Sequence, residues 1–155
     1  MAAAVFARIH QALAAATGEP LVAHGILVLE IEPAALLPTV RALKEHFGFD
    51  LFLDVTAVDW PERTPRFDVV LHFYSTTEHV RVRVKTRVGV DDPVVDTLVP
   101  LYGAARYMER ECHEMYGIGF RGNDDLRPLL LYEGFVGHPL RKDFVPAPGM
   151  DWAPR

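Results

Sequence analysis

The first third of the chain shows a helical and then a strand-like spacing of apolar residues. Apolar positions three or four residues apart predict an amphipathic first helix whose apolar face holds Phe6, Ile9, Leu13 and Ala16. We expect Gly18 and Pro20 to end this helix. Residues 21–31 are rich in Val, Ile and Leu, which predicts a strand interrupted by a turn near His24 and Gly25.

A second helix and three further strands follow. Pro33 favours a helix start and Gly48 a helix stop, while Pro38 either restarts the helix or removes one backbone hydrogen bond near its beginning. The apolar stripe of this helix is Leu36, Val40, Leu43 and Phe47. Strands are predicted over residues 51–60, 67–74 and 80–87. The short connections between them predict antiparallel neighbours.

Two more helices are expected after the strands. Asp92 and Pro93 are typical of an N-cap and a first helical turn. One helical face then collects Leu98, Leu101, Ala105, Met108, Cys112 and Met115. We expect Pro100 and Gly103 to divide this stretch into two helices and Gly117 to end the second.

The last part of the chain, residues 122–155, is here named the C-terminal segment. It is rich in Pro and Gly and has neither helical nor strand periodicity, yet it holds many large apolar residues. These are Leu126, Leu129, Leu130, Leu131, Tyr132, Phe135, Val136, Leu140, Phe144, Val145 and Trp152. The segment is too apolar for a disordered tail and too irregular to form its own core. It either docks on another protein surface or wraps back over its own domain.

Composition narrows the class of protein. The chain has 155 residues, half of them hydrophobic, which suffices for one folded domain. The net charge of −5 argues against a nucleic-acid binder. The single cysteine excludes a disulfide framework and a cysteine-ligated iron–sulfur cluster built by this chain alone. No run reaches the roughly 20 apolar residues of a membrane span, and the N-terminal stretch is better explained by an amphipathic helix than by a signal peptide.

Local motifs do not favour catalysis. Residues 117–122 match G-x-G-x-x-G, but a helix and not a strand is predicted before them, so a helix C-cap and turn is favoured over nucleotide binding. Cys112 and His113 are neighbours on a helix and point about 100° apart. Asp54 and Asp59 lie five apart in a strand and face opposite sides, which favours a turn cap for Asp59 over paired acid–base carboxylates.

Two sets of charged residues could either stabilise the fold of this chain or bind a partner. Alternate positions of one strand carry Arg81, Arg83, Lys85 and Arg87. This row is either a solvated sheet face or a binding surface for phosphate or an acidic partner, and the acidic chain favours a protein partner over nucleic acid. On the last helix, Arg110 and Glu114 are spaced to pair with each other, or else to pair with a neighbouring subunit.

Several stretches resemble the 30-kDa (C-type) subunit family of respiratory NADH:quinone oxidoreductase, complex I. They are residues 109–118 (ERECHEMYGI), 125–127 (DLR), 133–144 (EGFVGHPLRKDF) and the earlier 54–63 (DVTAVDWPER). The resemblance covers roughly residues 25–146 as one family domain. Asn123, the His113–Glu114 pair and Pro128 depart from the residues usual in the family.

The resemblance implies a two-layer α+β fold with the order helix, strand, helix and three strands, followed by helices and an extended C-terminal arm. We therefore divide the chain into an α/β domain over 1–121 and a docking segment over 122–155. It also implies a non-catalytic scaffold subunit of a proton-translocating oxidoreductase, peripheral on the cytoplasmic side of the membrane. FMN, iron–sulfur clusters and quinone are expected in partner subunits and no cofactor or metal in this chain. The expected partners are the large quinone-site subunit (D-type) and the iron–sulfur subunits (B-type and I-type).

The expected partner-binding residues come from the last helix and from the C-terminal segment. They are Glu109, Arg110, Glu111, Glu114, Met115, Tyr116, Leu126, Arg127, His138, Leu140, Arg141, Lys142, Asp143 and Phe144. One alternative is the equivalent scaffold in a related membrane-bound hydrogenase or a ferredoxin- or F420-linked dehydrogenase. Another, of a different class, is a free-standing nucleotide-binding enzyme that uses the G-x-G-x-x-G turn.

Overall fold

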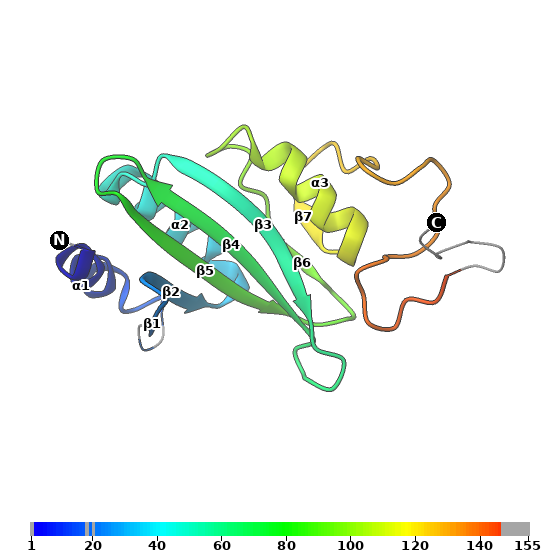
Figure 1. The fold of residues 1–155 in the computed structure, drawn as a ribbon, viewed down its shortest axis with the longest axis horizontal. Coiled ribbons are helices and arrows are strands. Elements are labelled where there is room, and N and C mark those ends of the chain that lie inside the picture. Colours follow the sequence, from blue (N-terminus) through cyan, green and yellow to red (C-terminus); the bar gives the residue numbers. More distant parts are fainter. Residues whose placement is uncertain (1, 18, 20, 147–155) are drawn as a thin grey trace.

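The computed structural model describes residues 2–17, 19 and 21–146 (Figure 1). Helices and strands follow the order α1 (Ala2–Leu13), β1 (Leu21–Ala23), β2 (Ile26–Ile31), α2 (Leu36–Phe47), β3 (Leu51–Asp59), β4 (Phe67–Ser75), β5 (Val80–Val88), β6 (Val94–Asp96), α3 (Ala105–Tyr116) and β7 (Gly119–Arg121). A short 3-10 turn, Pro33–Ala35, leads into α2. The predicted order of helix, strand, helix and three strands is confirmed.

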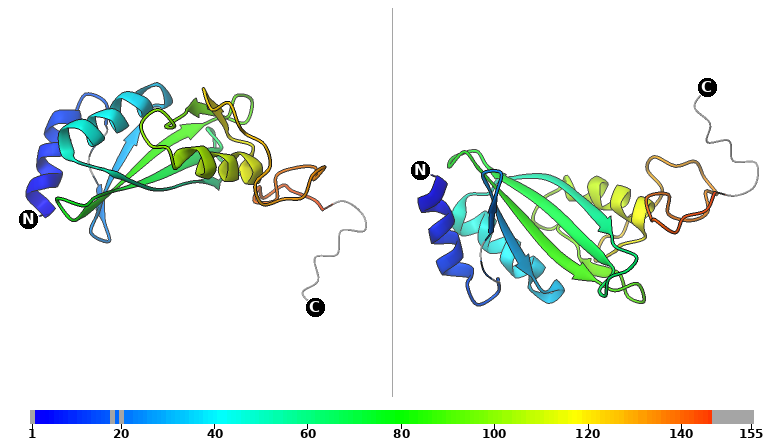
Figure 2. Two further views of the ribbon diagram at one scale, coloured as in Figure 1. Left: turned by 90° about the horizontal axis from the view of Figure 1, so that it is seen from above. Right: turned by 60° about the horizontal axis from the view of Figure 1, so that its bottom comes forward.

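The larger sheet has five strands in the order β1-β2-β5-β4-β3. Strands β3, β4 and β5 are antiparallel neighbours as predicted, whereas β2 joins β5 in parallel. The predicted turn between β1 and β2 is formed by His24 and Gly25, both with positive φ, and these two strands pair as a hairpin. Helices α2 and α3 lie on one side of the sheet (Figures 1 and 2), which gives a two-layer α+β architecture.

The core lies between this sheet and the helices. In β5 the burial alternates residue by residue, so Val80, Val82 and Val84 face the helices while the basic residues between them face outward. The predicted stripe of α2 is buried at Leu36, Val40 and Leu43, and Gly48 ends the helix in the left-handed conformation at φ 68°. Helix α1 buries Val5, Phe6 and Ile9 but ends at Leu13. The residues expected to end it, Gly18 and Pro20, lie outside the described part of the chain.

The prediction of a helix that begins at Asp92 and Pro93 is wrong. Residues 94–96 form β6, which pairs in parallel with β7, and the stretch to Gly103 is a turn leading into α3. The Pro93 carbonyl accepts the Gly119 N–H at 2.7 Å, so pairing with a strand more than twenty residues away begins where a cap was expected. Asp-Pro is compatible with both a helix start and a turn, and the distant strand decided between them.

None of the described helices has the length and apolar character needed to cross a membrane. The predicted end of α3 at Gly117 is confirmed. Gly119 to Arg121 belong to a strand, and no helix follows them in residues 122–146. The G-x-G-x-x-G match is therefore a C-cap followed by a strand, in the reverse of the order that dinucleotide binding needs.

A pair of leucine substitutions tests the placement of the core. Leu43 of α2 is fully buried and Leu21 of β1 is 58% exposed. We expect Leu43→Ala to lower the free energy of unfolding by about 2–5 kcal/mol because it leaves a cavity. The same change at Leu21 should cost less than about 0.5 kcal/mol. Urea unfolding followed by circular dichroism measures both, and equal losses would contradict this layer arrangement.

Candidate partner-docking site

The last turn of α3 is completed by the C-terminal segment. A helix leaves its final carbonyl groups without partners inside the helix. Here the Glu114 carbonyl accepts from the His138 ring at 2.9 Å, and the Met115 carbonyl accepts the Leu140 N–H at 3.1 Å. The Tyr116 carbonyl accepts from Nε of Arg141 at 2.6 Å. Residues 138–141 are thus fixed against the helix end.

Side chains of α3 hold an earlier stretch of the segment by its backbone. The Glu114 carboxylate accepts three successive N–H groups, from Leu129 at 3.1 Å, Leu130 at 3.0 Å and Leu131 at 2.9 Å. The Arg110 guanidinium donates to the carbonyls of residues 127 and 128 at 2.9 and 2.8 Å. The 8% exposure of Glu114 shows that this carboxylate has exchanged water for backbone donors.

A third contact ties the segment to the sheet at Asp59, the last residue of β3. Its carboxylate accepts two hydrogen bonds from Arg66, at 2.7 and 2.8 Å, and the Lys142 N–H at 2.7 Å. Arg66 also reaches Asp143 at 2.8 Å. The bonds from Arg66 lower the pKa of Asp59, and the Lys142 N–H acts in the same direction against the effect of burial. The turn cap expected for Asp59 is wrong, because this carboxylate binds across the molecule.

Gly117 permits the close approach of the segment to the helix end. Its φ of 73° is a left-handed conformation that other residues rarely adopt. A Cβ at this position would meet the Arg141 guanidinium and would lie 2.6 Å from Nε2 of His138. The sequence indicated the C-cap, but carried no signal that the glycine also makes room for two side chains of the C-terminal segment.

The buried carboxylate of Glu109 links the start of the C-terminal segment to the domain. It accepts from the Thr97 hydroxyl at 2.6 Å, the Leu98 N–H at 2.7 Å and the Asn123 amide at 2.9 Å. Burial raises its pKa, and the three donors oppose that shift. Glu109 is only 1% exposed, so its carboxylate binds within this chain and is not available to a partner. Asn123, which departs from the residue usual in the resembled family, supplies one of its three donors.

Many large apolar side chains of the segment remain in solvent despite these anchors, whereas Leu126 packs against the core. Within residues 122–146 no residue is buried. Exposed fractions are 62% for Leu130 and Tyr132 and 81% for Val136 and Val145, and Leu129 and Leu140 are also exposed. Phe135 stacks on Phe144 with ring centres 5.9 Å apart, a small satellite cluster. These hydrogen bonds therefore fix the backbone of the segment while many of its side chains stay accessible. Figure 2 shows the described part of the segment as an irregular loop that turns back on itself beyond α3. Trp152 lies outside the described residues.

The predicted partner-binding residues fall into two groups. Those whose polar atoms bind within the chain are Glu109, Arg110, Glu114, His138, Arg141 and Asp143. Those that are exposed or half-buried are Glu111, Met115, Tyr116, Leu126, Arg127, Leu140, Lys142 and Phe144. Arg127 belongs to both groups, because its exposed side chain also pairs with Asp125 at 2.8 Å. Arg110 and Glu114, considered as a pair within the helix, both bind the C-terminal segment in the structure. Arg66 and Asn123 were not predicted as part of the site, since Asp143 is 77 residues from Arg66 and Glu109 is 14 residues from Asn123.

Other candidate chemistry finds no support in the described residues. Burial raises the pKa of the Cys112 thiol, which keeps it protonated and unreactive. No group of three or more His, Cys, Asp or Glu residues is placed to hold a metal ion in the described part of the chain.

Comparison with protein families and curated proteins gives one consistent result. The family model described as respiratory-chain NADH dehydrogenase, 30 Kd subunit, matches residues 29–149. The C subunit of the NADH-quinone oxidoreductase of Xanthobacter autotrophicus is 43% identical over 140 residues, which cover 89% of this chain and 66% of that protein. The C subunit of Rhodobacter capsulatus is 45% identical over 125 residues, 79% of this chain and 62% of that protein. The chain therefore spans slightly less than two thirds of the length of these relatives.

Two solved structures share the fold. A trypsin-resistant fragment of Nqo5 aligns with a TM-score of 0.67 and 25% identity, over 79% of this chain and 99% of the fragment. A chain of the membrane-bound sulfane sulfur reductase, an archaeal respiratory membrane complex, aligns with a TM-score of 0.79 and 29% identity, over 92% of this chain and 84% of that chain.

Two glycine substitutions test the packing at the end of α3. Gly117→Ala combines an unfavourable φ with a collision against His138 and Arg141, whereas Gly25→Ala has nearly the same φ, 74°, with no atom within 4 Å. We expect each to lose about 1–2 kcal/mol of stability from the left-handed conformation. Gly117→Ala should lose at least about 1 kcal/mol more through overpacking, and hydrogen exchange should show its residues 138–142 losing protection. Equal behaviour of the two variants would contradict the contact.

The Asp59 contact predicts an acid-sensitive attachment. A carboxyl group whose pKa is lowered by folding stabilises the folded state above its unfolded pKa of about 3.9, and that contribution disappears as the pH falls through the lowered pKa. We expect the protection factor of the Lys142 amide, measured by NMR exchange, to fall below about pH 3.9. In Asp59→Asn it should be reduced already at pH 7, while the exposed Asp124→Asn should match the parent protein. An acid-independent protection factor in the parent would exclude this role.

Proposed function

The chain belongs to the family of the respiratory-chain NADH dehydrogenase 30 Kd subunit, and from this we propose that it is a non-catalytic docking subunit of an NADH:quinone oxidoreductase. Its role is to join other subunits of the complex through the C-terminal segment. FMN, iron–sulfur clusters and quinone belong to partner subunits, through which electrons pass from NADH to quinone. The subunit sits peripherally on the cytoplasmic side of the membrane.

The observation that carries this proposal is the contrast between a fixed backbone and free apolar side chains in residues 122–146. Water-exposed apolar residues gathered in one segment are typical of protein interfaces. The anchors at Glu114, Arg110 and Asp59 restrict the segment before a partner arrives, and a restricted segment loses less conformational entropy on binding. The side chains available for a partner are Leu129, Leu130, Tyr132, Val136, Leu140 and Val145.

The partners we propose are the large quinone-site subunit (D-type) and the iron–sulfur subunits (B-type and I-type). The contacts would come from the exposed members of the predicted set, with Leu140 and Phe144 as apolar anchors and Lys142 as a charged one. Burying one Leu or Phe side chain is worth roughly 1.5–3 kcal/mol, so a few such contacts suffice for stable attachment.

The division into a domain over 1–121 and a docking segment over 122–155 has support from two sides. The last strand ends at Arg121, and the segment beyond it up to residue 146 contains no helix or strand. The solved Nqo5 fragment is described as trypsin-resistant, and it aligns over 79% of this chain, which supports a stable domain that makes up most of the chain.

A second candidate is the equivalent scaffold in a related complex with another electron donor. The alignment with a chain of the sulfane sulfur reductase, at a TM-score of 0.79, supports this candidate. Identification of the co-purifying subunits distinguishes the two. A free-standing nucleotide-binding enzyme is disfavoured by the reversed order of elements around Gly117, and a fluorescence titration with NADH tests it directly.

Removal of the C-terminal segment tests the docking role. We expect a chain that ends at Gly122 to lose co-purification with the complex from native membranes, because the proposed interface is gone. Full-length Leu130→Ser/Tyr132→Ser/Val136→Ser should retain at most about one tenth of the normal yield, since each lost apolar burial is worth more than the 1.4 kcal/mol of a tenfold change. Tyr107→Ser and Val90→Ser, exposed outside the segment, serve as controls. Native yield for the chain ending at Gly122 would refute the docking role.

A further inference from the structure

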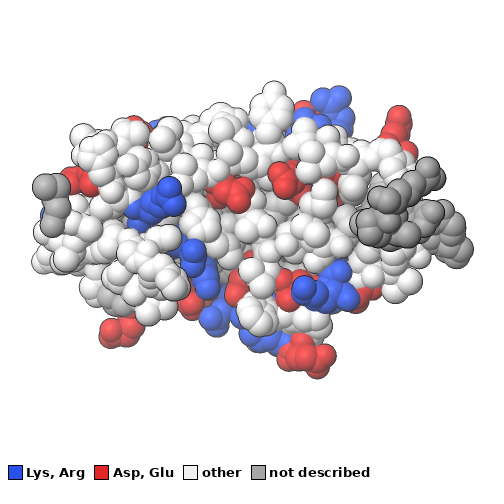
Figure 3. Space-filling view, in the orientation of Figure 1, with Lys and Arg blue, Asp and Glu red and all other residues white. Residues whose placement is uncertain are grey.

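The side of the sheet that faces away from the helices carries a row of basic side chains that the C-terminal segment does not use. The row is formed by Arg81, Arg83, Lys85 and Arg87 of β5. In Figure 3 Lys and Arg side chains run diagonally across this face, and Figure 1 shows that no described helix crosses it. Alternate residues of a strand lie roughly 6.8 Å apart, so the positive charges form a regular ladder.

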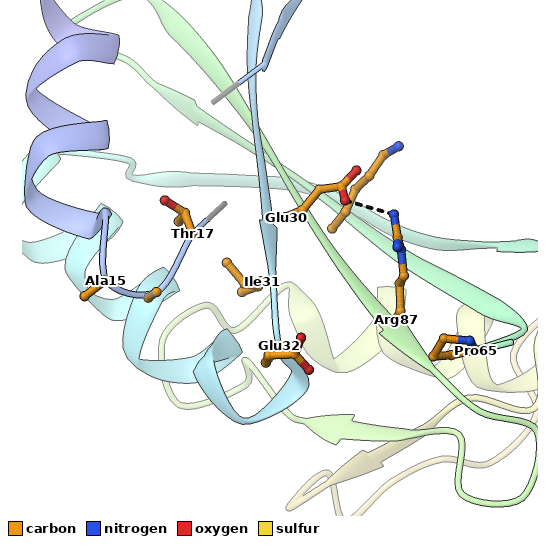
Figure 4. Close-up of a pocket in the computed structure, with 9 residues that line it drawn as sticks. Ala15, Thr17, Glu30, Ile31, Glu32, Pro65 and Arg87 are labelled. Atoms are coloured by element: carbon orange, nitrogen blue, oxygen red, sulfur yellow. Dashed lines mark hydrogen bonds and ion pairs between the residues drawn. The ribbon is translucent and has the colours of Figure 1, made fainter. Parts of the chain in front are cut away.

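One end of the row is neutralised within the chain. Arg87 pairs with Glu30 at 2.9 Å and approaches Asp68 at 3.6 Å. Beside it lies a hollow of about 460 Å³ lined by Lys85 and Arg87 but also by Glu30 and Glu32 (Figure 4). Because the carboxylates of Glu30 and Glu32 line the hollow and Arg87 is already paired, the hollow does not favour a small anion such as free phosphate.

The other three cations have no acidic partner among the ion pairs of the described residues. These are Arg81, Arg83 and Lys85. Arg83 is held in place by a neutral group, since its Nε donates to Nε2 of His72 at 2.8 Å. Burial, followed by the charge of Arg83, lowers the pKa of His72, which therefore acts as the acceptor. The guanidinium keeps its full charge and its remaining N–H groups for a ligand.

Acidic residues flank the row on both sides and restrict what fits it. Glu30 of β2 stands directly opposite Lys85, and Asp54 of β3 stands opposite His72 on the other side. A uniformly negative surface, such as a lipid headgroup layer or a nucleic-acid backbone, would meet these carboxylates as well as the cations. A narrow chain of carboxylates that follows only the row would not.

We propose that the Arg81–Arg83–Lys85 row binds an extended acidic segment of a partner polypeptide, with carboxylates at alternate residues. In such a segment alternate side chains lie at the same spacing as those of β5, so one carboxylate can face each cation. The flanking acids then select against a ligand in the wrong register or with broad negative charge. The inference rests on the proposed membership in a complex, but it concerns a surface on the opposite side of the sheet from the helix layer and separate from the C-terminal segment.

Charge reversal in the assembled complex tests this surface. Arg81→Glu/Lys85→Glu leaves the Arg83–His72 contact intact, and Arg8→Glu/Arg41→Glu on the helices gives the same change in net charge. At low salt we expect the first variant to bind the complex about tenfold more weakly than the parent, since two exposed ion pairs of up to about 1 kcal/mol each turn repulsive. This difference should shrink as the salt concentration rises, because salt screens the attraction in the parent and the repulsion in the variant. The helix variant should behave as the parent protein does. Identical salt curves for the two variants would overturn the proposal.

Photo-crosslinking in the same complex identifies the occupant. A benzophenone residue in place of Arg81 should crosslink to a partner segment with Asp or Glu at alternate positions, identified by mass spectrometry. Crosslinks only to lipid, to nucleic acid or to a segment without such residues would refute the proposal. The same residue in place of Val136 reports on the C-terminal segment. Crosslinks from position 136 without any from position 81 would leave the docking role in place and reject the basic row, whereas none from either would reject the proposed function itself.

Discussion

The rest of this structure depends on the hydrogen bonds between α3 and the C-terminal segment, in which each part supplies the partners that the other's backbone groups lack. A segment without helix or strand must find partners for its N–H and carbonyl groups outside itself. The end of α3 needs hydrogen-bond donors, because its last carbonyl groups have no partner within the helix. Here His138, Leu140 and Arg141 supply the donors, while Glu114 collects three N–H groups from the segment. Each part completes the other.

This arrangement orders the backbone of the C-terminal segment without burying many of its apolar side chains. Protein segments are usually ordered by burying apolar side chains, which uses up the surface that a partner would need. Carboxylates hold the segment here, and the three concerned, Glu109, Glu114 and Asp59, are all buried and saturated with donors. Charge-assisted hydrogen bonds of this kind are stronger than neutral ones, so a few of them can hold an extended backbone. Many apolar side chains of the segment thus remain exposed.

The fold places two different surfaces on one small scaffold. The sheet turns its apolar face to the helices and its basic row away from them, while the C-terminal segment leaves the domain at the end of α3. The proposed docking role calls for such separate contacts, because several neighbours are to be held at once. The similarity to the Nqo5 fragment and to a chain of an archaeal respiratory membrane complex shows that this fold recurs in other proteins.

The sequence by itself determined the local elements and the family. Periodicity located α1, α2 and the strands β3 to β5 because each buries one face, and the apolar residues of that face recur at a regular spacing within a short stretch of sequence. Long, unusual stretches such as residues 133–144 were enough to indicate the family. The sequence also showed that the C-terminal segment was too apolar for a free tail, but left open whether it covered its own domain.

Only the tertiary structure decided the contacts between distant residues. Asp92 and Pro93 look locally like a helix start, and the pairing of β6 with β7 overruled them. Asp59 looked like a turn cap until Lys142, 83 residues away, was placed against it, and Glu114 looked like a helical pairing partner until the backbone of residues 129–131 reached it. Helix caps and apolar stripes depend on neighbours within a few positions, whereas these hydrogen bonds depend on how the whole chain folds back, which no local pattern encodes.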